Sequence, residues 1–170
     1  REHNDHIMSK MGRMDPQGTP AADVTDAGVR FTLKSIWRDE QEQPLIDEER
    51  IVVLRSLDGA TVCDMTSRKT AGYGDVEFSK TKFGSIGVRV EPRLLPPLGG
   101  VIIADGDRRG TAAPVDTNRE SDFVAYENTV AGHTFGLFLH ILDAGTRGPW
   151  FVRDYGMAMY NPTWSGAISL

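Results

Sequence analysis

Hydrophobic and polar residues alternate with a period of two along most of the chain. The first such run spans Val29–Arg38, and a polar connection at residues 39–43 separates it from a second run, Leu45–Leu57. A period of two places alternate side chains on opposite faces of a strand, so the two runs predict a β-hairpin. The dipeptide Asp58-Gly59 is a strong turn signal. A third strand is therefore predicted over Thr61–Arg68.

The same alternation returns in the second half of the chain. Gly84–Glu91 and Ile102–Ala104 are predicted strands, whereas Leu94–Pro97 is a hydrophobic loop whose prolines cannot donate to a sheet. The polar, glycine-rich segment Asp105–Pro114 is predicted to be a surface loop. A further hairpin is predicted around residues 131–132, between strands at 123–127 and 134–142. In its second strand the predicted apolar face consists of Phe135, Leu137, Leu139 and Ile141.

These elements predict an all-β fold, because no stretch of ten or more residues has helical periodicity and no internal repeat occurs. Antiparallel strands joined by short turns favour an antiparallel β-sandwich. A length of 170 residues predicts one domain over 1–170. The chain opens at Arg1 and closes in the strand-like segment Ala167–Leu170, so we expect truncation at both ends, as in a fragment of a larger supersandwich.

Composition narrows the classes of partner. The net charge is −5, and the 19 lysines and arginines are scattered, so the basic stripe that nucleic acid requires is missing. No apolar run approaches the roughly 20 residues that cross a bilayer. We therefore expect a soluble chain without a nucleic-acid partner or a membrane span. Compartment and oligomeric state stay open.

The sequence predicts neither a metal site nor a cofactor. The single Cys63 excludes an internal disulfide and a cysteine-based zinc cage, and we expect it to be buried in a strand. A cluster of metal-capable residues at 2–6 matches no fixed ligand spacing. Asp105–Gly110 begins like a calcium loop, but Arg109 stands at its fifth position and Asp116 stands where a bidentate glutamate is needed. We interpret it as a glycine turn.

The run from Trp150 to Pro162 is the first candidate for chemistry. Arg153 and Asp154 lie among aromatic and apolar residues in a strand-like segment, where an unpartnered charge costs several kcal/mol. The segment is therefore either a structural polar network or part of a site. Its aromatic residues allow two interpretations as well, since they can stack on sugar rings or fill the core. They are Trp150, Tyr155, Tyr160 and Trp164.

Two residues elsewhere have similar alternatives. Arg89 projects opposite the apolar face of its predicted strand, so it either contacts an anionic or hydroxyl-rich ligand or is solvated. His140 stands among Phe138, Leu139 and Ile141, where it is either a structural residue or a general acid or base.

The segments 82–90, 150–156 and 161–162 resemble a bacterial, PmoA-like family of unknown function that carries the label methane oxygenase. The resemblance implies a β-sandwich with a link to carbohydrate processing, and hence a small-molecule or carbohydrate ligand. Methane oxidation is rejected, because this sequence has no spanning segment and no copper-ligand cluster. The resemblance points to the polar motif positions Lys82, Arg89, Arg153, Asp154, Tyr155 and Asn161.

Two functional hypotheses follow. In the first, the protein is an enzyme acting on a sugar or keto-sugar, in which Asp154 or His140 moves a proton. Arg153 or Lys82 then stabilises developing negative charge, and the other motif residues bind the ligand. In the second, the sandwich is a noncatalytic carbohydrate-binding or structural module. A concave site joining His140, Lys82 and Asp154 favours the enzyme, whereas their separation onto opposite sheet faces removes that mechanism.

Overall fold

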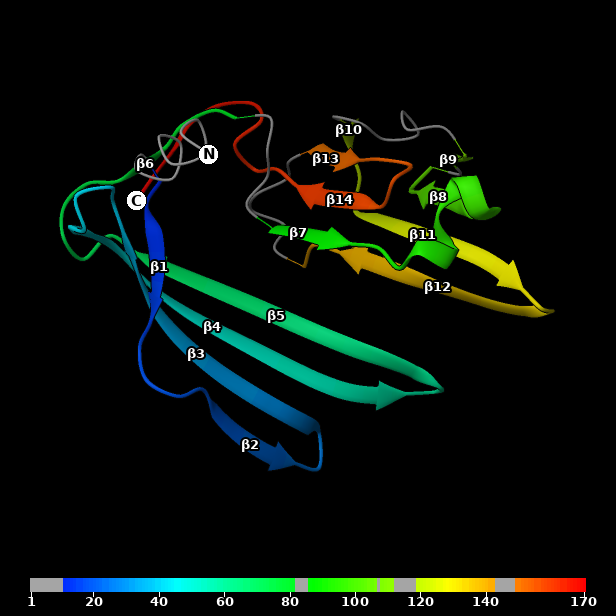
Figure 1. Cartoon of the computed structure of the whole chain (residues 1–170), viewed down its shortest axis with the longest axis horizontal. Coiled ribbons are helices and arrows are strands. Elements are labelled where there is room, and N and C mark those ends of the chain that lie inside the picture. The colour runs from blue at the N-terminus through cyan, green and yellow to red at the C-terminus, as the bar shows by residue number, and fades with distance from the viewer. Residues whose placement is uncertain (1–10, 82–85, 107, 112–118, 143–148) are drawn as a thin grey trace, which may run out of the picture. The chain divides into compact units, whose positions relative to one another are not determined.

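The computed structural model describes residues 11–81, 86–106, 108–111, 119–142 and 149–170. The described chain forms antiparallel sheets, as the alternation predicts, and it divides into two compact units (Figure 1). One unit runs to Glu77 and includes Ser169–Leu170, and the other is Phe78–Ile168. Among the described residues, no helix is long and apolar enough to cross a membrane.

The first unit is a five-stranded antiparallel sheet with the order β1-β3-β4-β5, in which β2 also pairs with β3. The predicted meander is confirmed, and the Asp58-Gly59 turn has positive φ at both residues (47° and 82°), as a tight hairpin turn requires. The strands are β1 (Arg13–Pro16), β2 (Ala21–Thr25), β3 (Gly28–Arg38), β4 (Pro44–Leu57) and β5 (Ala60–Thr70).

The second unit is a small β-sandwich made of two four-stranded sheets, which confirms the predicted architecture (Figure 1). Their strand orders are β10-β13-β14-β7 and β12-β11-β8-β9. The first sheet contains β7 (Ile86–Arg89), β10 (Arg119–Glu120), β13 (Pro149–Val152) and β14 (Met157–Tyr160). The second contains β8 (Val101–Ala104), β9 (Arg108–Gly110), β11 (Phe123–Val130) and β12 (His133–His140).

Side chains from both sheets form the core of this sandwich. Ile102, Val124 and Val152 are fully buried there, and the predicted apolar face of β12 packs against them. Two hydrogen bonds also fix this arrangement. The Tyr126 hydroxyl of β11 donates to the carbonyl of Arg153 beside β13 at 2.8 Å, and Trp150 Nε1 donates at the same distance to the carbonyl of residue 121, in the connection between β10 and β11. The sandwich is therefore fixed by polar as well as apolar contacts.

Short elements complete the described chain. The 3₁₀ turns η1 (Pro92–Leu94) and η2 (Pro96–Leu98) occupy the predicted hydrophobic loop. The strands β6 (Glu77–Phe78) and β15 (Ile168–Ser169) form a two-stranded ladder.

Three sequence predictions were wrong in detail. The run from Trp150 to Pro162 is not one strand but the β13–β14 hairpin, closed by the turn at residues 153–156. The predicted loop after Ala104 contains β9, because Ile103 and its neighbours offer this segment a strand edge. Cys63 does lie in a strand, β5, but it is exposed rather than buried.

Candidate functional site

A pocket forms where the outer edge of the first sheet is interrupted. β1 pairs with β3 as far as Pro16, opposite Ser35, and β2 resumes the pairing only at Ala21, opposite Thr32. Proline has no backbone N–H to donate to a ladder, so Pro16 and the nearby Pro20 favour this break. The chain between the two strands lines a pocket of about 240 Å³, whose floor reaches β3 and β4.

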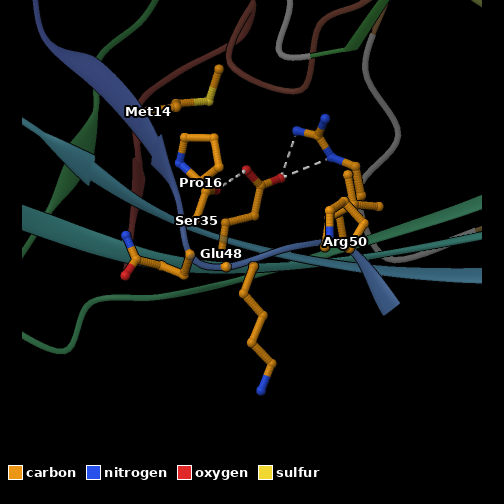
Figure 2. Close-up of a pocket in the computed structure, with 10 residues that line it drawn as sticks. Met14, Pro16, Ser35, Glu48 and Arg50 are labelled. Atoms are coloured by element: carbon orange, nitrogen blue, oxygen red, sulfur yellow. Dashed lines mark hydrogen bonds and ion pairs between the residues drawn. The ribbon is translucent and has the colours of Figure 1, made fainter. Parts of the chain in front are cut away.

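A buried carboxylate lies at the inner end of this pocket. Glu48 projects from β4, and its side chain is only 2% exposed. Its Oε1 atom accepts hydrogen bonds from Arg50 (Nε at 3.3 Å and Nη2 at 2.8 Å) and from the Ser67 hydroxyl at 2.6 Å. Figure 2 shows the Glu48 carboxylate between Pro16 and the guanidinium of Arg50. The arginine is thereby fixed at the pocket wall.

The second carboxylate oxygen is also bonded. Trp37 Nε1 donates to Glu48 Oε2 at 2.9 Å, and the Ser35 hydroxyl donates to the same oxygen at 3.4 Å. Lys69 projects from the neighbouring strand β5, and its ammonium lies 3.9 Å from Oε1 of Glu48 and 5.5 Å from the centre of the Trp37 ring. A carboxylate has about four lone-pair positions. Those of Glu48 are therefore saturated by groups of the protein.

The network keeps this carboxylate ionised. Burial raises the pKa of Glu48, but the hydrogen bonds from Ser67, Trp37 and Arg50 and the charge of Arg50 outweigh it and lower the pKa from 4.5 to about 2. Burial lowers the pKa of Lys69, the charge of Glu48 raises it, and Arg50 lowers it further. At neutral pH, Glu48 has no proton to donate and is a weak base. Its role in the network is to position its partners.

The pocket walls differ in polarity. Met14, Pro16, Pro20 and Leu33 provide apolar surface, whereas Ser35, Gln17 and Arg50 provide hydrogen-bonding groups. The volume is below the roughly 300–1,000 Å³ typical of sites for drug-sized ligands. The arrangement suits a small ligand with an apolar face and a polar rim.

The structure brings four of the sequence-predicted residues together at one end of the second unit. Arg153, Asp154 and Tyr155 form the β13–β14 turn, and Arg89 lies beside it because β7 pairs with β14 through Met157. The guanidinium of Arg153 stacks on the Phe151 ring at 3.9 Å and donates to the carbonyl of Val152. Tyr155 is 52% exposed. Because the turn has these contacts, a structural role accounts for Arg153.

His140 does not join this group. It lies directly opposite Phe123 at the end of β12, so both point away from the sandwich core, and Phe123 stacks on the exposed Phe138. Tyr126 points the other way, towards the Arg153 carbonyl of the Asp154 turn. The sheet therefore lies between His140 and Asp154. The geometry that the enzyme hypothesis requires of these two residues is not present.

The remaining predicted residues are accounted for by packing or lie outside the described chain. The Asn161 amide is 1% exposed; it donates to the carbonyl of Thr81 at 2.7 Å and accepts from the amide and hydroxyl of Thr163. Trp150 and Tyr160 are core residues. Lys82 and the metal-capable residues at 2–6 lie outside the described residues. Across the described part of the chain, no group of three or more His, Cys, Asp or Glu residues is arranged to hold a metal ion.

Sequence reasoning missed the Glu48 network, although the sequence contains a signal for it. Ile46, Glu48, Arg50 and Val52 share one face of the alternating run 45–57. Charged residues on an apolar face need partners, as Arg153 does in its own segment. The same reasoning, applied to the longest predicted strand, identifies Glu48.

Comparison with known proteins gives a family but no precedent for the site. The model of a family of unknown function, DUF6807, matches residues 2–170. No curated protein and no solved structure matches the chain.

Proposed function

We propose that this chain, which belongs to the family of unknown function DUF6807, is a noncatalytic carbohydrate-binding protein that holds a monosaccharide in the pocket beside Glu48. The observation that carries the proposal is the pairing of an apolar wall with polar groups fixed by a saturated carboxylate. A sugar ring has the complementary surface, since its C–H groups are apolar and its hydroxyls both donate and accept. The carbohydrate link implied by the PmoA-like resemblance agrees with this choice.

Two features favour binding over catalysis. General acid–base work requires a group whose pKa lies near the working pH, and the pKa of Glu48 is about 2. Its oxygens are also engaged by five hydrogen bonds from the protein. The alternative enzyme needs His140 and Asp154 in one site, whereas the sheet that contains β11 and β12 lies between these two residues. The pocket therefore supports recognition without turnover.

The expected affinity is modest. A hexose has about 12 non-hydrogen atoms, and roughly 0.3 kcal/mol per atom gives about 3.6 kcal/mol, or a Kd of about 2 mM. We would measure binding by the shifts of ¹⁵N-amide NMR signals during titration with a panel of mono- and disaccharides. At least one monosaccharide should bind saturably at this level.

A matched pair of variants tests the location. Leu33→Trp places an indole in the pocket, whereas Val29→Trp places the same group four residues away on the same face of β3, outside the pocket lining. Both positions are half-buried in the same strand, so the two proteins carry a similar perturbation. Binding should be lost in Leu33→Trp and kept in Val29→Trp. Saturable binding by neither wild type nor variants, or equal binding by all three, would overturn the proposal.

A further inference from the structure

We propose that the sugar bound in this pocket is acidic, with a carboxylate that pairs with Arg50, so that the ligand class is a uronic acid. This inference rests on the proposed function and adds the charge of the ligand to it. Two observations support it. One sheet face has more cations than carboxylates, and one edge of the Arg50 guanidinium faces the pocket.

The register of the sheet shows the imbalance. Glu48 lies opposite Ser35 on β3 and Lys69 on β5, and Arg50 lies opposite Leu33 and Ser67. Along this face of the paired segments of β3, β4 and β5, the charged residues are one carboxylate and two cations. The face therefore has a net charge of +1. A bound anion that contacts the network would neutralise this charge.

The excess charge is held in place. The ammonium of Lys69 donates to the Ser67 hydroxyl at 2.8 Å and lies over the Trp37 ring, and its side chain is only 20% exposed. Arg50 is tied to the same carboxylate oxygen that attracts Lys69. Burial is the main cause that lowers the pKa of Lys69; the charge of Glu48 raises this pKa, and repulsion from the neighbouring Arg50 lowers it further. An added carboxylate would offset the repulsion between the two cations.

Arg50 is the residue positioned to receive the anion. Its guanidinium has five N–H donors, of which those on Nε and Nη2 bond to Glu48. Nη1 makes no hydrogen bond with the part of the chain that the structure describes. The side chain is 39% exposed and lines the pocket. Because a guanidinium bonds a carboxylate with two parallel, charge-assisted hydrogen bonds, Arg50 should distinguish an acidic sugar from a neutral one.

Glucuronate and glucose provide the test, because they differ only in having a carboxylate or a hydroxymethyl group on the same ring. We would measure both dissociation constants on the full chain by NMR titration, at about 50 mM and about 500 mM salt, with acetate as a carboxylate lacking the ring. Glucuronate should bind at least about ten-fold more tightly than glucose at low salt, and the ratio should fall at high salt because exposed charges are screened. Acetate should bind more weakly than glucuronate.

Two variants assign the preference to the network. Arg50→Gln should bring the ratio of glucuronate affinity to glucose affinity close to one. Lys69→Gln removes the excess charge without altering a pocket-lining residue, so it should reduce this affinity ratio while the affinity for glucose stays unchanged. If Arg50→Gln does not fold, Lys69→Gln still tests the inference. Equal affinity for both sugars in wild type would overturn the acidic-ligand inference and leave sugar binding standing. Binding of neither sugar would overturn both, and acetate binding as tightly as glucuronate would show a simple anion site.

Discussion

Replacing Glu48 with glutamine removes the one negative charge from the network while nearly preserving the shape of the side chain. Arg50 and Lys69 are then left as neighbouring cations without their shared counter-charge. The amide oxygen of glutamine can still accept some of the hydrogen bonds, but they lose their charge-assisted strength. We expect the first unit to be destabilised, with its sheet otherwise unchanged.

The magnitude follows from the pKa. A fall in the carboxyl pKa of Glu48 from 4.5 to about 2 corresponds to about 3 kcal/mol of stabilisation, at about 1.4 kcal/mol per pKa unit. Because the pKa is lowered in the folded state, this stability is fully present above pH 4.5 and is lost as the pH falls towards about 2. Glu48→Gln should therefore lower the unfolding free energy by about 2–3 kcal/mol at pH 7. The difference from wild type should shrink steadily between pH 4.5 and 2.

The assay is urea-dependent hydrogen exchange of the backbone amides of β4, which reports the opening of this sheet rather than of the whole chain. Glu49→Gln is the matched control, since Glu49 is the next residue on β4 and its only ion pair within the described residues, to the exposed Lys34, is 3.8 Å long. That variant should change stability by less than about 0.5 kcal/mol. An equally small effect of Glu48→Gln at pH 7, or a difference that does not change between pH 7 and pH 2, would refute this account of the network.

Three further variants test individual contacts. Ser67→Ala removes the 2.6 Å hydrogen bond to Glu48, so it should cost about 1–2 kcal/mol and move the acid-unfolding midpoint, followed by circular dichroism, to higher pH. Asn161→Ala leaves the buried carbonyl of Thr81 without its donor and should lower stability by about 2–3 kcal/mol in urea unfolding; a loss below about 0.5 kcal/mol would contradict its structural role. Asp154→Asn, at a half-buried position of the β13–β14 turn, should leave both urea stability and sugar binding within error of wild type, and loss of binding would instead place the sugar site at this turn.

Periodicity was sufficient for strands such as β11 and β12, because one face of each is more buried than the other. The alternation over 29–38 and 45–57 predicted β3 and β4, and the apolar face of β12 was identified residue by residue. The short turn between β13 and β14 was missed because a single glycine, directly after Arg153, Asp154 and Tyr155, is its main turn signal in the sequence. Gly156 has φ +85° there, and this is the signal that the strand turns back.

The candidate site was harder to predict because its determinants come from different strands. Ser67 and Lys69 reach Glu48 only through the β4–β5 register, and Trp37 reaches it through β3. These contacts join residues far apart in the sequence, so no local motif predicts them. The pocket itself depends on the break between β1 and β2; Pro16 and Pro20 favour that break, but their sequence positions do not show which strand β1 and β2 pair with. By contrast, the polar segment 153–155 attracted attention because its charges are adjacent in sequence.

Hydrogen exchange, mapped with and without bound sugar, would locate the sugar on the sheet. The full chain would be studied by mass spectrometry in the presence of glucuronate at about ten times its measured Kd, where most molecules are occupied. The account predicts slower exchange in β1, in β3 around Leu33–Ser35, and in β4 around Glu48–Arg50, with β11 and β12 unchanged. Unchanged exchange in β3 and β4, or protection confined to the second unit, would contradict it.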